Sequence, residues 1–151
     1  MNKIEVLNII LNFGIGWSIK DVLVNKTTKE VDIYLEYTLD TCFYSEEKSV
    51  CVIYDFTKSR RIRHLDMFDY KTFLNFRTPR AKLSTGESRV IPLNFSDARV
   101  SFSYDFESKV IECLELCKNQ SQTAHYLQTS FEIVHHIMER AVNRGLSRRS
   151  L

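Results

Sequence analysis

The chain alternates between two kinds of side chain along Val31-Asp32-Ile33-Tyr34-Leu35-Glu36-Tyr37, where Val31, Ile33, Leu35 and Tyr37 occupy every second position. A period of two is typical of a β-strand with one buried face. Residues 19–24 are also rich in branched side chains, and the polar link 25–30 separates the two runs. Together they predict a β-hairpin.

The rest of the first two-thirds of the chain has the same character. Short runs with strand composition lie at 50–54, 61–65, 72–77 and 89–93, separated by polar turns and by Pro79 and Gly86. Before the hairpin, residues 2–13 carry apolar side chains at helical spacing, namely Ile4, Leu7, Ile10 and Leu11, and Gly14 follows them. We expect a short amphipathic helix that caps a sheet.

The period of the sequence changes after Ala98. Apolar side chains then recur at helical intervals, at Phe102, Phe106, Val110, Cys113, Leu114 and Cys117. The pattern predicts a helix over 103–117, a short helix capped by Ser121 that runs to Leu127, and a helix that begins near Thr129, where Thr129 and Glu132 have capping-box spacing. The expected fold class is α+β, with a β-rich module at 1–97 and a helical module at 98–151.

Length and composition favour a small globular protein. A chain of 151 residues holds one domain or two small ones, which excludes a large multi-domain enzyme, and its 44% hydrophobic residues supply a core. The longest apolar stretch, around residues 6–13, is interrupted by Asn8 and Asn12 and is too short to span a bilayer. We therefore expect a cytoplasmic protein with no membrane partner.

The four cysteines, Cys42, Cys51, Cys113 and Cys117, allow two disulfides or a metal site in principle. A cytoplasmic location disfavours disulfides. Structural zinc sites favour two close pairs such as CxxC, whereas eight residues separate Cys42 from Cys51. Cys113 and Cys117 are four apart in a helical pattern, which favours small buried side chains over metal ligands.

Residues 120–139 have the pattern of a helix-turn-helix. Such a motif needs a small residue where its helices cross, which Ala124 supplies, and apolar residues such as Val134 and Ile137 where the second helix packs back. Leu127 closes the first helix. Gln128 stands where Gly is usual, so either Gln128 adopts a positive φ or the turn is longer and differently shaped. The pattern alone fits two packed helices of any bundle equally well.

The exposed side of the second helix would present polar side chains to the DNA major groove. These side chains are Ser130, Glu132, His135, His136 and Arg140. Neighbouring histidines on a helix point about 100° apart, so His135 and His136 make a poor metal pair. No Ser, Cys or carboxylate has catalytic spacing to either histidine, and we expect a protein without enzymatic activity.

Basic residues are concentrated in two blocks, although the net charge is only +2. The first block holds Lys58, Arg60, Arg61, Arg63, Lys71, Arg77, Arg80 and Lys82, opposed only by Asp66 and Asp69. The second holds Arg140, Arg144, Arg148 and Arg149, whereas residues 97–115 are acidic. A solvated basic face explains such blocks as well as a nucleic-acid surface does.

The middle of the chain carries a more specific pattern. The run Arg61-Ile62-Arg63-His64-Leu65-Asp66, followed by Tyr70, Leu74 and Pro79-Arg80, resembles the signature of the ISL-three family of bacterial insertion-sequence transposases. The resemblance extends upstream to Asp32-Ile33-Tyr34 and downstream to Arg148-Arg149, and so covers almost the whole chain. It implies a zinc-finger-like β module and a helix-turn-helix that bind double-stranded DNA ahead of a DDE-type catalytic domain.

The chain departs from this family pattern in its cysteines. The family holds zinc with a CxxC pair and a second Cys-containing pair; here Cys42 matches the first ligand, but Ser45 replaces its partner and Leu83 replaces a downstream ligand. We therefore expect neither zinc nor another cofactor. The β module would instead be stabilised by an aromatic core, for which the candidates are Phe43, Tyr54, Phe68, Tyr70, Phe73 and Phe76.

The resemblance leads to a hypothesis of sequence-specific binding to the terminal repeats of an insertion sequence. Phosphate contacts would come from Arg60, Arg61, Arg63, Lys71, Arg77 and Arg80, while the second helix of the motif reads base edges. Asp66 would pair with an Arg or His to hold a turn. Because the chain ends at Leu151, before the family's catalytic domain would begin, the resemblance implies a truncated transposase.

Two alternatives remain at the level of the sequence. One is a non-catalytic interaction module that forms a homodimer or binds a full-length transposase, using the acidic helix around residues 107–115. The other, less favoured, is a small hydrolase or metalloenzyme. A stable dimer without DNA affinity would distinguish the first alternative, and one tightly bound zinc per chain would distinguish the second.

Overall fold

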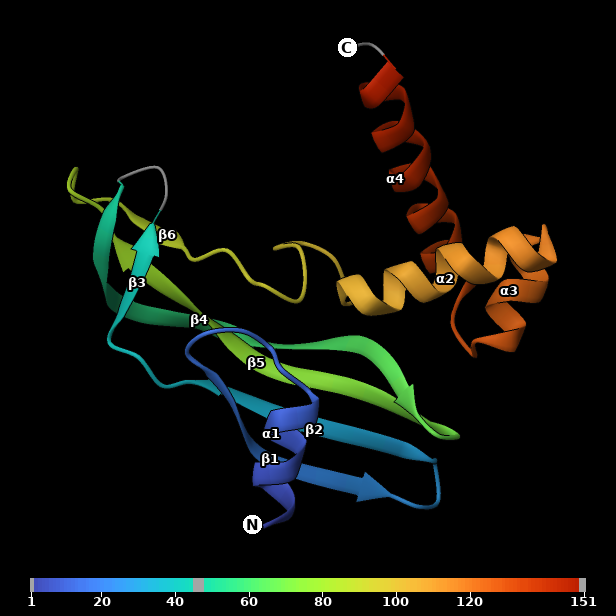
Figure 1. The fold of residues 1–151 in the computed structure, drawn as a ribbon, viewed down its shortest axis with the longest axis horizontal. Coiled ribbons are helices and arrows are strands. Elements are labelled where there is room, and N and C mark those ends of the chain that lie inside the picture. Colours follow the sequence, from blue (N-terminus) through green and yellow to red (C-terminus); the bar gives the residue numbers. More distant parts are fainter. Residues whose placement is uncertain (1, 45–47, 150–151) are drawn as a thin grey trace. The chain divides into compact units, whose positions relative to one another are not determined.

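The computed structural model describes residues 2–44 and 48–149, which combine β-strands with α-helices (Figure 1). These residues form one six-stranded sheet and four helices, three of them in the C-terminal part. The expected α+β class is confirmed. No helix within the described ranges is long and apolar enough to cross a membrane.

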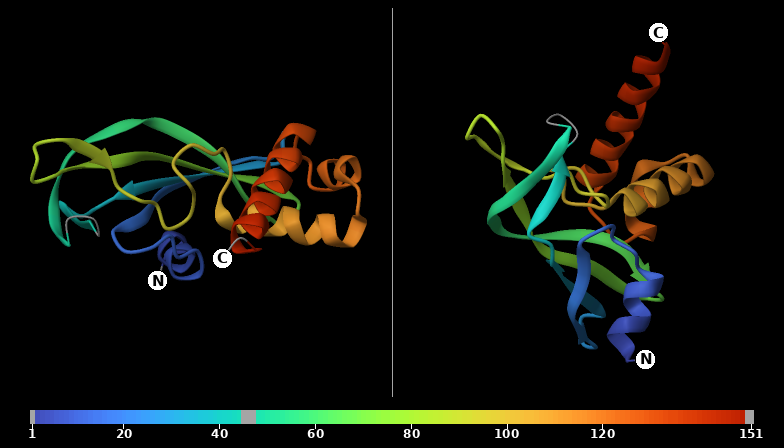
Figure 2. Two further views of the ribbon diagram at one scale, coloured as in Figure 1. Left: turned by 90° about the horizontal axis from the view of Figure 1, so that it is seen from above. Right: turned by 60° about the vertical axis from the view of Figure 1, so that its left-hand side comes forward.

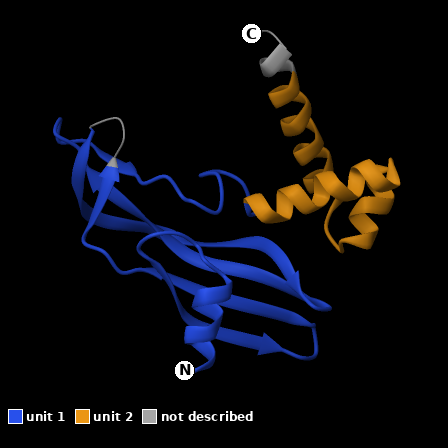
Figure 3. Cartoon of the chain, in the orientation of Figure 1, with its two compact units in different colours: residues 1–103 blue, residues 104–151 orange. Residues whose placement is uncertain are grey.

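The chain divides into two units, residues 1–103 and residues 104–151 (Figure 3). The boundary follows Ser103, whereas the sequence placed it after residue 97. Residues 98–103 remain with the sheet because their backbone bonds to it: the Arg63 N–H donates to the Ser101 carbonyl (2.8 Å), and the Ser103 N–H donates to the Arg63 carbonyl (2.9 Å). The helical period that begins at Phe102 thus starts inside the first unit.

The strands of the first unit are β1 (Trp17–Asn25), β2 (Glu30–Tyr37), β3 (Thr41–Tyr44), β4 (Ser49–Met67), β5 (Tyr70–Lys82) and β6 (Ser88–Val90). Their order in the sheet is β1-β2-β5-β4-β3, and β6 pairs with β5. The hairpin of β1 and β2 is confirmed. Neighbouring strands are antiparallel, except that β2 runs parallel to β5.

Several features of the sheet differ from the sequence prediction. β5 continues through Pro79, which was expected to separate strands, and β6 ends at Val90, short of the strand expected to reach residue 93. β4 is continuous over 19 residues and joins the two strands expected at 50–54 and 61–65. The polar residues between them stay paired with β5 through register shifts, one of which lies between Phe56 and Ser59. The short strand β3 was not predicted, because four residues that follow a polar segment show no clear period.

The helix α1 (Lys3–Ile10) lies against one face of this sheet (Figure 2). It begins with a capping box, in which the Asn2 side chain accepts from the Glu5 N–H and the Glu5 carboxylate accepts from the Asn2 N–H. Leu7 packs against the core, whereas Ile10, expected on the same side, is 69% exposed. The helix ends earlier than the apolar spacing suggested.

The aromatic core differs from the predicted set. Of the six candidates only Phe76 is buried, while Phe68 is 99% exposed in the turn between β4 and β5. Phe43 and Tyr54 are 62% and 60% exposed, and Tyr70 and Phe73 are half-buried. The rings that meet in the core are those of Phe13, Trp17, Phe76 and Phe95, in edge-to-face contacts.

The region that resembles a zinc site is apolar where the structure describes it. Leu83 is 7% exposed and packs with Cys51, Ala81 and Ile91, and Cys42 lies against the same cluster. Ser45 lies outside the described residues. Within the described ranges, no three His, Cys, Asp or Glu side chains gather as metal ligands would.

Candidate nucleic-acid interface

The second unit contains the helices α2 (Tyr104–Cys117), α3 (Gln120–Tyr126) and α4 (Phe131–Arg149). Residues 127–130 connect α3 to α4. In this turn the Thr129 N–H donates to the Ala124 carbonyl (3.0 Å), and Gln128 adopts a φ of 53°. The turn therefore uses the positive φ that was one of the two solutions expected for a Gln in place of Gly.

The caps of both helices differ by one or two residues from those expected. α3 is capped by Asn119, whose side chain accepts from the Gln122 N–H at 2.9 Å, in place of Ser121. At α4 the Ser130 hydroxyl accepts from the Ile133 N–H at 3.2 Å, so Ser130 takes the role assigned to Thr129. Asn and Ser are both strong N-cap residues, and the sequence has more than one candidate N-cap residue near the start of each helix.

Apolar side chains hold α3 and α4 together as the motif requires. Val134 and Ile137 are fully buried, and Ala124 is 6% exposed. The expected apolar stripe of α4 is therefore confirmed at its central positions. On α2, Cys113 is buried as expected but Cys117 is exposed, with the two sulfur atoms 3.9 Å apart.

The five side chains predicted to face a DNA groove fall into two groups. Glu132 and His136 are exposed, and Ser130 is an exposed cap. His135 is half-buried; its ring stacks on Phe131, and its Nδ1 lies 3.1 Å from the Gln120 Oε1 atom. The structure thus brings Ser130, Glu132 and His136 to the surface of α4. The His135 side chain is 46% exposed as well, but it is engaged by Phe131, Gln120 and Glu139 of the same unit.

Arg140, the fifth predicted side chain, is part of a buried ion cluster. Its Nε donates to Glu107 at 2.6 Å, and Arg144 donates to the same carboxylate at 3.1 Å. The Glu107 side chain is only 5% exposed. Arg140 and Arg144 therefore neutralise a buried carboxylate of α2, which leaves the guanidinium of Arg140 with fewer N–H groups for a phosphate.

Two exposed residues of α4 were missed by the sequence analysis. Glu139 and Asn143 follow Glu132 and His136 at intervals of three and four, which places all four on one side of the helix. That spacing is visible in the sequence and could have identified them. The side chains of Arg148 and Arg149 lie outside the described part of the chain.

The strained turn residue gives a test of the turn geometry. Gln128→Gly is expected to raise the free energy of unfolding by about 0.5 kcal/mol, because glycine adopts a positive φ without the steric cost of a Cβ atom. The matched change Gln122→Gly, inside α3, should lower it by about 1 kcal/mol. Urea unfolding followed by far-ultraviolet circular dichroism measures both. Equal losses in the two variants would contradict a left-handed conformation at Gln128.

The basic block of the first unit lies along β4 and β5, where most of its arginines are held by acceptors within the protein. Arg61 forms two hydrogen bonds to Asp32 (2.8 and 3.3 Å), and its guanidinium lies 3.6 Å from the centre of the Phe73 ring. The Arg61 guanidinium holds the pKa of Asp32 below its usual value. Arg61 is nevertheless 46% exposed, although its guanidinium also lies 3.7 Å from the Glu30 carboxylate.

Arg63 requires a correction. Its side chain is only 7% exposed, and its guanidinium donates to Asp66 at 2.8 Å. A side chain this deeply buried does not reach a phosphate, and Arg63 is removed from the set of phosphate contacts. Asp66 pairs with a basic side chain as expected, but both partners lie within β4, so the expectation that the pair holds a turn is wrong. His64 is buried beside Ser103, with 2.7 Å between Nδ1 and Oγ.

The remaining members of the block differ in their partners. Arg80 is ion-paired with Asp55, and the exposed Arg77 donates to the Thr57 carbonyl at 2.8 Å. Arg60 points to the other side of β4, where it donates to the Val100 carbonyl at 2.6 Å and lies over the Phe76 ring. Lys71 is half-buried on β5. Arg77 and Lys71 are thus predicted residues that have no acidic partner in the described part of this sheet.

The ion pair of Asp32 and Arg61 predicts a pH dependence. Because the folded-state pKa of Asp32 is depressed, its stabilising effect is present above the unfolded value and is lost as the pH falls through the folded value. Asp32→Asn should therefore lower the free energy of unfolding by about 1 kcal/mol above about pH 5. The difference from the wild type should shrink steadily in more acidic buffers.

The control for this experiment is Asp40→Asn, which removes an exposed carboxylate that has no ion-pair partner among the described residues. Urea titrations at several pH values measure both variants. If the Asp32→Asn difference kept its size in acid, the ion pair would not be its cause.

A scan of protein-family models and searches of curated proteins and of solved structures found no match to this chain. The features that bear on function are therefore those of the two units themselves. They are a pair of helices with an exposed polar face on α4, and a sheet with basic side chains along β4 and β5.

Proposed function

We propose that this protein binds double-stranded DNA, and that α3 and α4 act as a helix-turn-helix whose second helix reads base edges. The observation that carries the proposal is the division of α4 into two sides. Val134 and Ile137 are fully buried against the unit, while Glu132 and His136 are exposed one turn apart near the start of the helix. Recognition helices contact bases with the exposed residues of their first turns.

The chemistry of this face suggests which bases it would read. A glutamate in the major groove accepts a hydrogen bond from the amino group of cytosine, and each good base contact contributes about 1–3 kcal/mol of discrimination. Glu132 would serve as such an acceptor. The resemblance to insertion-sequence transposases makes the terminal repeats of such an element the natural target to test first.

Phosphate contacts would come from the basic residues that keep N–H groups available. On the first unit these are Lys71 and Arg77, with Arg61 and Arg80 contributing the donors that their internal partners leave over. Arg60 is not among them, because it points to the other side of β4. Contacts of this kind supply affinity and salt dependence and carry no sequence information.

The test is fluorescence anisotropy of labelled duplex DNA over a salt series. The double variant Lys71→Gln, Arg77→Gln should reduce the slope of log K against log salt by about one unit for each phosphate that is no longer neutralised. The control Lys3→Gln, Lys26→Gln removes the same charge from exposed positions of α1 and the β1–β2 turn and should leave the slope nearly unchanged. No binding of the wild type at low salt would remove the proposal.

Sequence readout is tested separately, by selection from random duplexes. Glu132→Ala should change the preferred base at one position, whereas Glu112→Ala makes the same change of charge on the exposed side of α2 and should not. Identical selected sequences for the wild type and Glu132→Ala would show that this side chain does not read a base.

A second function, a protein-interaction module, is favoured by one feature of the first unit. The hairpin of β3 and β4 exposes large apolar side chains, with Phe43, Val50, Val52 and Tyr54 each 60–63% exposed. Patches of this kind commonly mark protein interfaces. The acidic helix offers less than expected, because Glu107 is buried. Light scattering that shows a stable dimer, together with no DNA affinity, would favour this function.

A further inference from the structure

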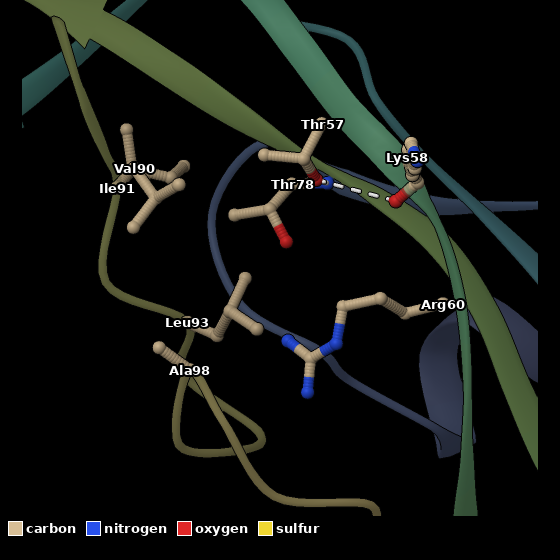
Figure 4. Close-up of a pocket in the computed structure, with 8 residues that line it drawn as sticks. All are labelled: Thr57, Lys58, Arg60, Thr78, Val90, Ile91, Leu93 and Ala98. Atoms are coloured by element: carbon tan, nitrogen blue, oxygen red, sulfur yellow. Dashed lines mark hydrogen bonds between the residues drawn. The ribbon is translucent and has the colours of Figure 1, made fainter.

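The first unit contains a cavity of about 320 Å³ between the strands β4 and β5 and the segment that follows β6 (Figure 4). Its volume lies at the lower end of the range of about 300–1,000 Å³ for small-molecule sites. One part of its lining is polar, with Arg60 and Thr78, and another part is apolar, with Val90, Ile91 and Leu93. None of the described residues that line it is acidic.

Arg60 is the unusual member of this lining. Figure 4 shows its guanidinium group and the Thr78 hydroxyl directed into the space between the strands and the facing segment. Its one acceptor within the described residues is the Val100 carbonyl, at 2.6 Å, and it has no carboxylate partner there. By contrast, Arg61 and Arg80 on the same two strands are paired with Asp32 and Asp55.

A guanidinium in this position is energetically costly. It is half-buried beside the Phe76 ring, and burial lowers the pKa of Arg60. Of its five N–H donors, one is used by the Val100 carbonyl. An anion that enters the cavity would restore the hydrogen bonds and the charge balance that burial removes.

From this combination we propose that the cavity binds a small carboxylic acid with a hydrocarbon body. The carboxylate would accept hydrogen bonds from Arg60 and Thr78, and the hydrocarbon part would lie against Val90, which is 39% exposed, with the buried Ile91 and Leu93 behind it. A guanidinium pairs equally well with a phosphate, including one of a DNA backbone. The apolar wall favours the carboxylic acid, because a phosphodiester has nothing to place against it.

The test uses hexanoate as the probe, with hexanamide as its uncharged equivalent and inorganic phosphate and duplex DNA as competitors. In heteronuclear NMR titrations of the full chain, hexanoate should bind saturably and shift the amide signals of Thr78, Ile91 and Leu93. Hexanamide should bind at least about ten-fold more weakly, since a charge-assisted hydrogen bond contributes about that factor. Neither phosphate nor duplex DNA should displace hexanoate.

Three variants separate the role of Arg60 from its effect on folding. Arg60→Gln should weaken hexanoate binding at least about ten-fold, whereas Lys58→Gln, at the exposed rim of the same cavity, should change it less than about three-fold. Ala98→Leu keeps Arg60, fills space at an exposed lining position, and should abolish binding while the circular dichroism spectrum stays that of the wild type.

Three results would overturn the proposal. They are equal affinity for hexanoate and hexanamide, undiminished binding by Ala98→Leu, and displacement of hexanoate by phosphate or duplex DNA. The last result would assign the cavity to a phosphate group instead. The proposal does not depend on DNA binding, and each is tested by its own ligand.

Discussion

Replacing Glu107 with alanine is expected to lower the free energy of unfolding of the helical unit by about 3 kcal/mol. The Glu107 side chain is 5% exposed and accepts from both Arg140 and Arg144, so its removal leaves two like charges one helical turn apart without this counter-ion. Loss of one partner of a fully buried pair costs about 3–5 kcal/mol. The lower end applies here because Arg144 is 45% exposed and can be rehydrated.

The control for Glu107→Ala lies on the same helix. Glu112 is an exposed residue of α2, and Glu112→Ala should change the free energy of unfolding by less than about 0.5 kcal/mol. Far-ultraviolet circular dichroism during urea unfolding reports mainly on this unit, because three of the four described helices belong to it. Similar losses in the two variants would mean that the buried ion cluster is not what connects α2 to α4.

The ion cluster also shows why part of the candidate site could not be predicted. The sequence indicated the order of the helices, the buried stripe at Val134 and Ile137, and the problem posed by Gln128 in the turn. All of these depend on residues close together in the chain. The partner of Arg140 is Glu107, a distant residue on another helix, and no local pattern connects them. A basic residue near an exposed helical face was therefore assigned to DNA.

The same reason explains the errors in the basic block. The sequence shows that basic residues are concentrated in residues 58–82, but strand pairing decides which side chains and carbonyl groups surround each arginine. Arg61 meets Asp32 because β2 and β4 both flank β5, and Arg63 is buried because residues 101–103 return to pair with β4. Neither contact has a signal in the local sequence. The density of basic residues in the sequence therefore indicates which segment carries the basic charge. It does not indicate which of these side chains are left without internal partners and can bind a phosphate.

The fold itself was predicted well where a period is long and poorly where it is short or absent. The alternation at residues 31–37 predicted β2, and the helical spacing after residue 102 predicted α2. Residues 91–103 form no strand or helix, apart from a single bridge at Phe102, yet they bury Ile91, Leu93, Phe95, Val100 and Phe102. Irregular segments have no period from which burial can be inferred.

Phe95 on this segment should be among the most sensitive positions of the first unit. Its ring centre lies 5.7, 5.3 and 5.1 Å from the ring centres of Phe13, Trp17 and Phe76, in edge-to-face contacts. Phe95→Ala removes all three ring pairs and leaves a cavity, and such changes in a core cost about 3–5 kcal/mol. Trp17, the one tryptophan of the chain, is itself a member of the cluster, so its fluorescence during urea unfolding measures the destabilisation of this unit.

The matched control is Phe68→Ala, which deletes the same side chain from a position that is 99% exposed. Its free energy of unfolding should stay within about 0.5 kcal/mol of the wild type, because the Phe68 ring is already surrounded by solvent in the folded protein. The pair is informative because the sequence favours the opposite result: Phe68 lies in an aromatic-rich stretch next to two strands, and Phe95 lies in a polar, irregular one. A larger destabilisation by Phe68→Ala would mean that the aromatic core forms around the β4–β5 turn, whereas a destabilisation confined to Phe95→Ala would place it beneath α1, where the rings of Phe13 and Trp17 both contact Phe95.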